Sequence, residues 1–142
     1  VHQPLHASDR NDKGGNDYQI SLRTDIAPEA YARDRYVGGV MGTNLNSIWD
    51  YYILGSLGLD LRAYSDRLDR LPWPPYPASS GYDLKPLAWS GESCRLIEAR
   101  GMYPEQHTMD HAYLDAMRPL AEQRIRQAAW RLAKLVNQTL GT

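Results

Sequence analysis

The sequence predicts a mainly α-helical domain with a small β-hairpin near its amino terminus. Two patterns indicate this fold class. Apolar residues recur at spacings of three and four over much of the second half of the chain, which is the period of an amphipathic helix. Apolar and polar residues alternate between residues 18 and 23, which is the period of a half-buried strand. The chain has 142 residues, of which 42% are hydrophobic and 23% are charged. One compact domain over residues 1–142 can therefore bury a core.

The amino-terminal part of the chain predicts the hairpin. Residues 1–17 are polar and loop-like after Pro4, and Gly14-Gly15 marks a turn in which the backbone bends freely. Residues 18–23 form the first strand. Residues 37–41 are the best candidate for the strand that returns beside it, so the loop of the hairpin is long.

Two helices are expected next. The first begins near Ile48, takes Asn44 or Ser47 as its cap, and ends at Gly58. The second covers Asp60–Leu71, where apolar residues at spacings of three and four give it one apolar side: Leu61, Tyr64, Leu68 and Leu71.

A proline-rich, extended linker at residues 72–77 precedes the last two helices. The third helix runs from Leu84 or Lys85 to Arg100. The fourth is the longest, about Thr108–Leu140, and Pro119 allows either one bent helix or two successive ones. Its apolar residues step by three and four and predict a stripe that faces the core: Leu114, Met117, Ala121, Ile125, Ala128, Leu132, Leu135 and Thr139.

Charge and composition exclude several classes of protein. The formal net charge is -1, so a strong positive field for binding duplex DNA is absent. Metal-dependent nuclease chemistry remains open, because bound cations supply their own positive charge. No apolar run reaches the roughly 18 residues that a membrane helix needs. Cys94 is the single cysteine and cannot form an internal disulfide. Val1–Pro4 lacks the pattern of a signal peptide.

Two residue pairs have a spacing that suits metal binding. His2 and His6 are four residues apart, and so are Asn46 and Asp50. Zinc prefers imidazole nitrogen and carboxylate oxygen, usually as four donors in a tetrahedron. Side chains four apart on a helix point the same way, so each pair is a candidate to face one metal. Pro4 argues against a regular helix between the two histidines.

Other motifs point to ordinary structure. His107 and His111 repeat the spacing of four, but they fit a solvated helix start. Asp9–Gly14 begins like a calcium loop and fails where Lys13 and Ile20 replace oxygen ligands. Neither a phosphate-binding loop of the Walker type nor a Gly-x-Ser-x-Gly nucleophile motif occurs.

Several segments together resemble the zinc-dependent single-strand nucleases of the S-one and P-one type. The order and spacing agree for His2–His6, Asp12–Asp17 and Thr43–Asp50. Leu87–Ser93 and Ala128–Ala133 resemble two later segments of the same family. The similarity runs nearly end to end along this chain and covers about the second half of a family member.

The resemblance implies a partial helical fold of the phospholipase C/nuclease kind, because zinc phospholipase C shares it. It implies a secreted or periplasmic enzyme that uses three zinc ions to hydrolyse single-stranded DNA and RNA, often with 3′-nucleotidase activity. It assigns His6 and Asp50 as ligands of one zinc. Asn46 occupies a position that normally holds the histidine of that set, and an amide oxygen is the weaker donor.

The resemblance also limits what this chain does alone. In the family, the ligands of the other two zincs precede the His2–His6 segment, so this chain supplies one zinc site at most. Because the family's mechanism needs a metal pair, we expect little hydrolysis by this polypeptide by itself. We expect it to associate with single-stranded nucleic acid or nucleotides, and to pair with the missing amino-terminal half or with a second copy.

A group of polar residues beside the zinc is expected to contact a nucleotide: Gly15, Asn16, Asp17 and Asn44. The alternative is a turn whose side chains bond their own backbone. Tyr51, Trp73 and Tyr82 are candidates to stack on bases, or are core and linker aromatics. Rival functions are a non-catalytic binding module of the same fold, which Asn46 favours, a lipid phosphodiesterase, and a helical domain with accidental motifs.

Overall fold

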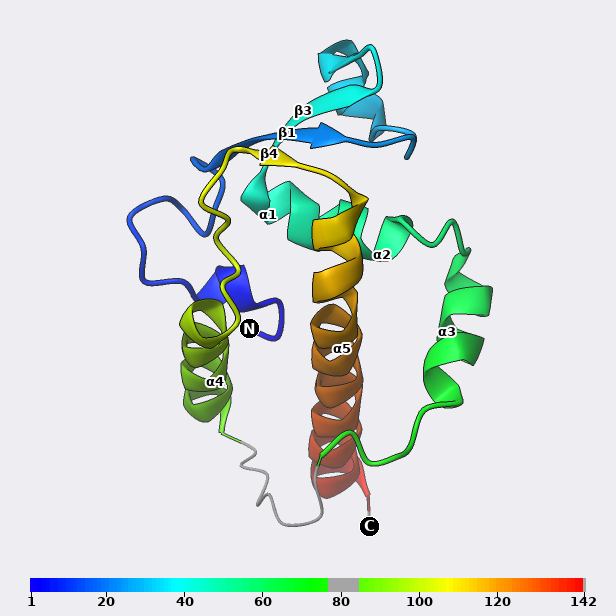
Figure 1. The fold of residues 1–142 in the computed structure, drawn as a ribbon. Helices are drawn as coiled ribbons and strands as arrows, with labels where there is room; N and C mark the ends of the chain where they lie inside the picture. The colour runs from blue at the N-terminus through cyan, green and yellow to red at the C-terminus, as the bar shows by residue number, and fades with distance from the viewer. Residues whose placement is uncertain (77–84, 142) are drawn as a thin grey trace.

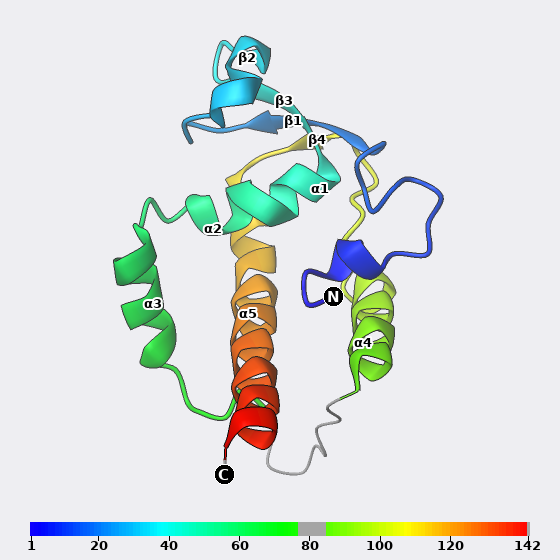
Figure 2. The same cartoon turned by 180° about the vertical axis from the view of Figure 1, so that it is seen from behind.

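The structure is a computed structural model that describes residues 1–76 and 85–141. A small sheet lies across one end of the long helix α5, and helices α3 and α4 flank α5 on opposite sides (Figures 1 and 2). The elements follow this order: η1 Pro4–Ala7, β1 Gln19–Arg23, η2 Ala30–Arg35, β2 Tyr36–Val37, β3 Val40–Asn44, α1 Leu45–Ser47, η3 Ile48–Tyr52, α2 Ile53–Gly55, α3 Leu61–Asp69, α4 Pro86–Ala99, β4 Thr108–Met109 and α5 His111–Leu140. Within the described ranges, none of the helices combines the length and apolar content needed to cross a lipid bilayer. The fold is mainly helical, as predicted.

The sheet has four strands in the order β2-β3-β1-β4, so it is larger than the predicted hairpin. Strand β1 confirms the alternation at residues 18–23 and pairs antiparallel with β3. The returning strand was predicted at residues 37–41 and instead lies at Val40–Asn44. The reason is that Gly38 and Gly39 have φ of +59° and +78°, which makes them the tight turn between β2 and β3.

The helices after the sheet begin at side-chain caps. Asn44 accepts a hydrogen bond from the Ser47 backbone nitrogen at 2.8 Å, so the helical segment starts at Leu45, three residues earlier than predicted. Asp60 caps α3 in the same way. The last helix was predicted from Thr108, but Thr108–Met109 is strand β4 and Asp110 caps α5. A single helix continues through Pro119.

The core lies between the sheet, η1, the helical segment of residues 45–55 and the first turns of α5. Its most deeply buried apolar side chains come from these four parts and, with Met102, from the segment after α4: Leu5, Ile20, Leu22, Met41, Leu45, Ile48, Tyr52, Ile53, Met102 and Leu114. Burying each Leu, Ile or Met side chain is worth about 1.5–3 kcal/mol relative to leaving it in water. This packing holds η1 against the helical segment that follows β3.

The predicted core-facing stripe of the last helix is buried over only part of its length. Leu114 and Ala121 are 0% and 7% exposed, but Ile125 and Leu132 are 41% and 63% exposed. Leu61 of α3 is also exposed rather than core-facing. A helical period predicts where a stripe lies on the helix, but the neighbouring elements decide which part of it is covered.

From Glu122 onward the buried residues of α5 are polar instead. Arg131 and Arg124 are 0% and 3% exposed and face Glu92 of α4. Arg131 Nη2 donates to both Glu92 oxygens at 2.6 and 2.8 Å, and Arg124 Nη1 donates to Glu92 Oε2 at 3.1 Å. Desolvation raises the pKa of Glu92, but the hydrogen bonds from the two guanidinium groups outweigh it and leave the pKa below its usual value. This ionic cluster joins α4 to α5.

Candidate metal site

His6 and Asp50 lie side by side although 44 positions separate them in the sequence. His6 Nε2 is 3.4 Å from Asp50 Oδ1, and the side chains are 50% and 44% exposed. The 3₁₀ turn η1 carries His6, and η3, a π-helical stretch, carries Asp50. π-helical turns inside helices occur frequently at functional sites. Both side chains are thus about half exposed to solvent.

Asn46 borders the same site from the start of the helical segment. Its amide Nδ2 donates a hydrogen bond to the Gly14 carbonyl oxygen at 3.0 Å. His6 and Asn46 both line a cavity of about 470 Å³ whose other walls come from the loop that follows η1. That loop contributes Arg10, Lys13 and Asn16, so two cationic side chains border the cavity.

The Gly14-Gly15 turn packs directly against the helix that bears Asn46. Gly15 has φ of +84°, and a Cβ placed on it would lie 3.2 Å from the Asn46 backbone nitrogen. The Gly15 carbonyl accepts a hydrogen bond from that same nitrogen at 3.3 Å. Glycine is therefore required for the close approach as well as for the left-handed backbone. The turn forms the wall of the cavity beside His6.

The other residues expected to contact a nucleotide have neighbours of their own. Asn16 lines the cavity, and its Nδ2 donates to the Lys13 carbonyl at 2.8 Å. Asp17 Oδ1 pairs with Lys13 Nζ at 3.1 Å. Asn44 serves as the helix cap. Asp17 Oδ1 and Asn44 Oδ1 are thus already used inside the protein.

The remaining sequence candidates lie elsewhere. Tyr51 donates from its hydroxyl to the Ala27 carbonyl, and Trp73 is 53% exposed against Trp130. Tyr82 lies outside the described residues. His107 and His111 make separate contacts, the first with the Gln19 carbonyl and the second with Thr24 and Asp25.

His2 does not join His6, contrary to what the spacing of four suggested. Its Nε2 is 2.8 Å from Arg131 Nη1, inside the ionic cluster. An arginine can only donate, so His2 accepts and is neutral. Burial, followed by the charges of Arg124 and Arg131, lowers the pKa of His2 to about 4. Because Pro4 prevents a regular helix from His2 to His6, the two imidazoles do not share a face: His2 contacts Arg131 and His6 lies beside Asp50.

Sequence reasoning missed Gln3, which reaches the site from the segment before η1. Its Nε2 donates to Asp50 Oδ1 at 2.8 Å. Gln3 and Asp50 also border a second cavity of about 300 Å³, whose walls are largely apolar and include Trp49, Leu54 and Ile125. No sequence pattern marks such a contact, since it joins the start of η1 to the distant η3 through an uncharged side chain.

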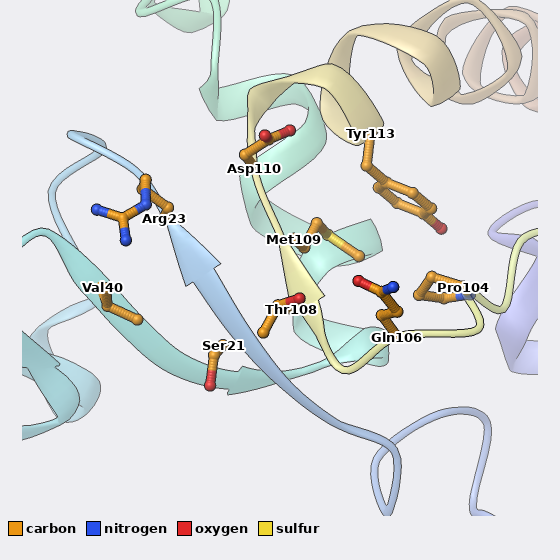
Figure 3. A pocket seen from close by; sticks show the side chains of 9 residues that line it. All are labelled: Ser21, Arg23, Val40, Pro104, Gln106, Thr108, Met109, Asp110 and Tyr113. Atoms are coloured by element: carbon orange, nitrogen blue, oxygen red, sulfur yellow. The ribbon is translucent and has the colours of Figure 1, made fainter.

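A further cavity of about 460 Å³ lies beside strand β4, where side chains from β1, β4 and the start of α5 surround it (Figure 3). Its polar side chains include Ser21, Arg23 and Asp110. It contains neither His6 nor Asp50, so it is separate from the candidate metal site.

The donor set at the site is small. Over residues 1–76 and 85–141, no cluster of three or more histidine, cysteine, aspartate or glutamate side chains is placed to hold a metal. His6 and Asp50 are two donors of the type that zinc prefers, and Asn46 adds a neutral amide. These donors could hold an ion weakly and would leave coordination positions open for water or a substrate oxygen.

The family model described as S1/P1 nuclease matches residues 1–141. A search of curated proteins returns no match for the chain.

Proposed function

Since the chain belongs to the S1/P1 nuclease family, we propose that it acts on phosphodiester bonds of single-stranded DNA and RNA through zinc held by His6 and Asp50. Members of this family are nucleases and are generally zinc-dependent. The observation that carries the proposal is the separation of 3.4 Å between His6 Nε2 and Asp50 Oδ1.

The separation of these two atoms supports a zinc ion. Zinc binds imidazole nitrogen and carboxylate oxygen at about 2.0–2.2 Å in a tetrahedron, which requires two donors to lie roughly 3.3–3.5 Å apart. His6 and Asp50 meet this requirement. Asn46 is proposed as a third, weaker ligand, because an amide oxygen carries no charge.

The cavity beside His6 suits a phosphate group. Arg10 and Lys13 bring positive charge to its wall, although Glu98 and Asp17 partly neutralise them. A bound zinc lowers the pKa of a water molecule and stabilises charge on phosphoryl oxygens. The chain's own residues would hold the ion and orient the phosphate beside it.

The nucleotide itself is proposed to lie along the loop and the helix start. Asn16 lines the cavity, while Gly15, Asp17 and Asn44 contact Asn46, Lys13 and Ser47 beside it. One weakly held zinc lacks the clamp of a metal pair, so we propose that this polypeptide alone turns over slowly. Family members are typically secreted, and we propose the same for this protein.

The test is hydrolysis of a fluorescent single-stranded oligonucleotide with zinc, with a chelator, and with the same oligonucleotide as a duplex. We expect weak cleavage of the single strand that zinc supports and His6→Ala abolishes. His107→Ala is the matched control, because His107 is exposed and contacts the Gln19 carbonyl instead. Cleavage that is indifferent to zinc or to His6→Ala would refute the proposal.

A second candidate is a binding module of the same fold without catalysis, and the neutral Asn46 among the ligands favours it. The same assay separates the two functions when binding is measured by fluorescence anisotropy. Zinc-dependent binding of the single strand without cleavage would support the module. Cleavage of phosphatidylcholine in preference to the oligonucleotide would instead indicate a lipid phosphodiesterase.

A further inference from the structure

We infer that Gln3 is a positioning residue of the metal site, which fixes the Asp50 carboxylate and the turn that carries His6 at the same time. This inference rests on the proposed role of His6 and Asp50 as zinc ligands. Gln3 contacts both Asp50 and the turn that contains His6, and both ends of its side-chain amide are engaged.

The donor end of the amide holds Asp50. Gln3 Nε2 is 2.8 Å from Asp50 Oδ1, the same oxygen that lies 3.4 Å from His6 Nε2. A half-exposed carboxylate without such a bond rotates among several rotamers. The hydrogen bond selects the rotamer that brings this oxygen beside His6. A carboxylate oxygen accepts more than one bond, so Gln3 leaves room for an ion on Asp50.

The acceptor end of the amide holds the turn. Gln3 Oε1 accepts a hydrogen bond from the Leu5 backbone nitrogen at 2.5 Å and caps η1. His6 lies within this turn, so the cap sets the position of the imidazole. One side chain thereby fixes both zinc donors relative to each other.

The backbone ahead of Gln3 is itself anchored to the two long helices. Two hydrogen bonds from α4 and α5 reach this backbone: Ser93 Oγ donates to the Val1 carbonyl at 2.6 Å, and Arg124 Nε donates to the His2 carbonyl at 3.1 Å. Arg131 Nη1 also donates to the His2 side chain at Nε2, at 2.8 Å. Ser93, Arg124 and Arg131 are buried. The backbone position of Gln3 is therefore fixed relative to α4 and α5.

Capping alone does not explain a glutamine at this position. Serine, threonine, aspartate and asparagine are the preferred caps, because a short side chain reaches the nearby backbone nitrogens. Only the longer amide also donates to a carboxylate 47 positions away. Replacing a residue that forms a hydrogen bond with a metal ligand typically weakens metal binding by about 10–100-fold.

The experiment compares Gln3→Ser with Gln3→Met. Serine keeps a capping oxygen but is too short to reach Asp50, and methionine keeps the length but removes both polar ends. The zinc dissociation constant is measured by competition with a chromophoric chelator, and the cobalt-substituted protein gives an absorption spectrum of the ligand field. Gln123→Met, an exposed glutamine on α5, is the matched control.

We expect both Gln3 variants to bind zinc at least tenfold more weakly, with a changed cobalt spectrum, while Gln3→Ser and Gln123→Met unfold at the wild-type temperature. If Gln3→Ser loses less than tenfold in affinity, Gln3 is only a helix cap and the inference is wrong. Wild-type protein that binds no zinc would instead overturn the proposed function and remove the basis of this inference.

Discussion

Replacing Asn46 by histidine tests the account of the metal site at its weakest ligand. The amide Nδ2 of Asn46 donates to the Gly14 carbonyl at 3.0 Å. In histidine, Nδ1 occupies the corresponding place on the side chain, so it inherits this hydrogen bond as a donor. The ring is then the tautomer whose Nε2 is unprotonated and free to bind a metal.

The expected gain follows from the change in donor. Structural zinc sites with four ligands bind with about 10–16 kcal/mol, or roughly 3 kcal/mol for each ligand. The amide that histidine replaces contributes little of this. A gain of about 3 kcal/mol corresponds to roughly a hundredfold tighter zinc binding.

Zinc affinity of Asn46→His is measured by chelator competition at fixed pH. Asn137→His is the matched control, since it adds an imidazole on the exposed far end of α5. We expect the hundredfold gain for Asn46→His and no gain for the control. A folded Asn46→His protein whose affinity matches wild type within threefold would show that residue 46 does not face the ion, and the proposed ligand set would be wrong.

Three further predictions concern the fold that holds the site. Leu114→Ala is expected to lower the free energy of unfolding in urea by about 2–5 kcal/mol, because Leu114 is fully buried. Leu132→Ala is expected to change it by less than about 0.5 kcal/mol. Equal losses would mean that Leu132 on α5 is covered rather than exposed. Gly14→Ala and Gly38→Ala both place alanine at positive φ, which costs about 1–2 kcal/mol. At Gly14 the new Cβ would also lie 2.6 Å from a backbone carbonyl oxygen, so Gly14→Ala is expected to unfold at a clearly lower temperature than Gly38→Ala. The pKa of His2 falls from 6.5 in the unfolded chain to about 4 in the fold, so its contribution to stability is present above pH 6.5 and is lost as the pH falls toward 4. His2→Gln is expected to flatten the dependence of the unfolding free energy on pH between 4 and 6.5. An unchanged dependence would contradict a neutral His2.

The sequence predicts the local elements well where local chemistry determines them. The alternation at residues 18–23, the cap at Asn44 and the end of the third predicted helix near Arg100 each depend on a few neighbouring residues, and all three appear in the structure. Strand β4 could not be predicted in this way. Thr108–Met109 is a strand because it pairs with β1, which lies more than 80 positions earlier.

The residues of the candidate site also differ in how far the sequence predicts them. The segment resemblance marks His6 and Asp50, and the structure brings their donor atoms together. Neither composition nor spacing marks Gln3, because its contact with Asp50 exists only in three dimensions. The spacing of His2 and His6 was misleading, since the pair of buried arginines on α5 binds His2 instead. A helical period on α5 predicts an apolar stripe but does not predict that arginines fill the interface with α4.

The central claim is that His6 and Asp50 hold one zinc ion, and calorimetric titration of the metal-free protein with zinc tests it most directly. We predict one zinc per chain for the wild type, and none for His6→Ala and Asp50→Ala under the same conditions. A wild-type protein that takes up no zinc, or variants that still bind one zinc with wild-type affinity, would contradict the claim.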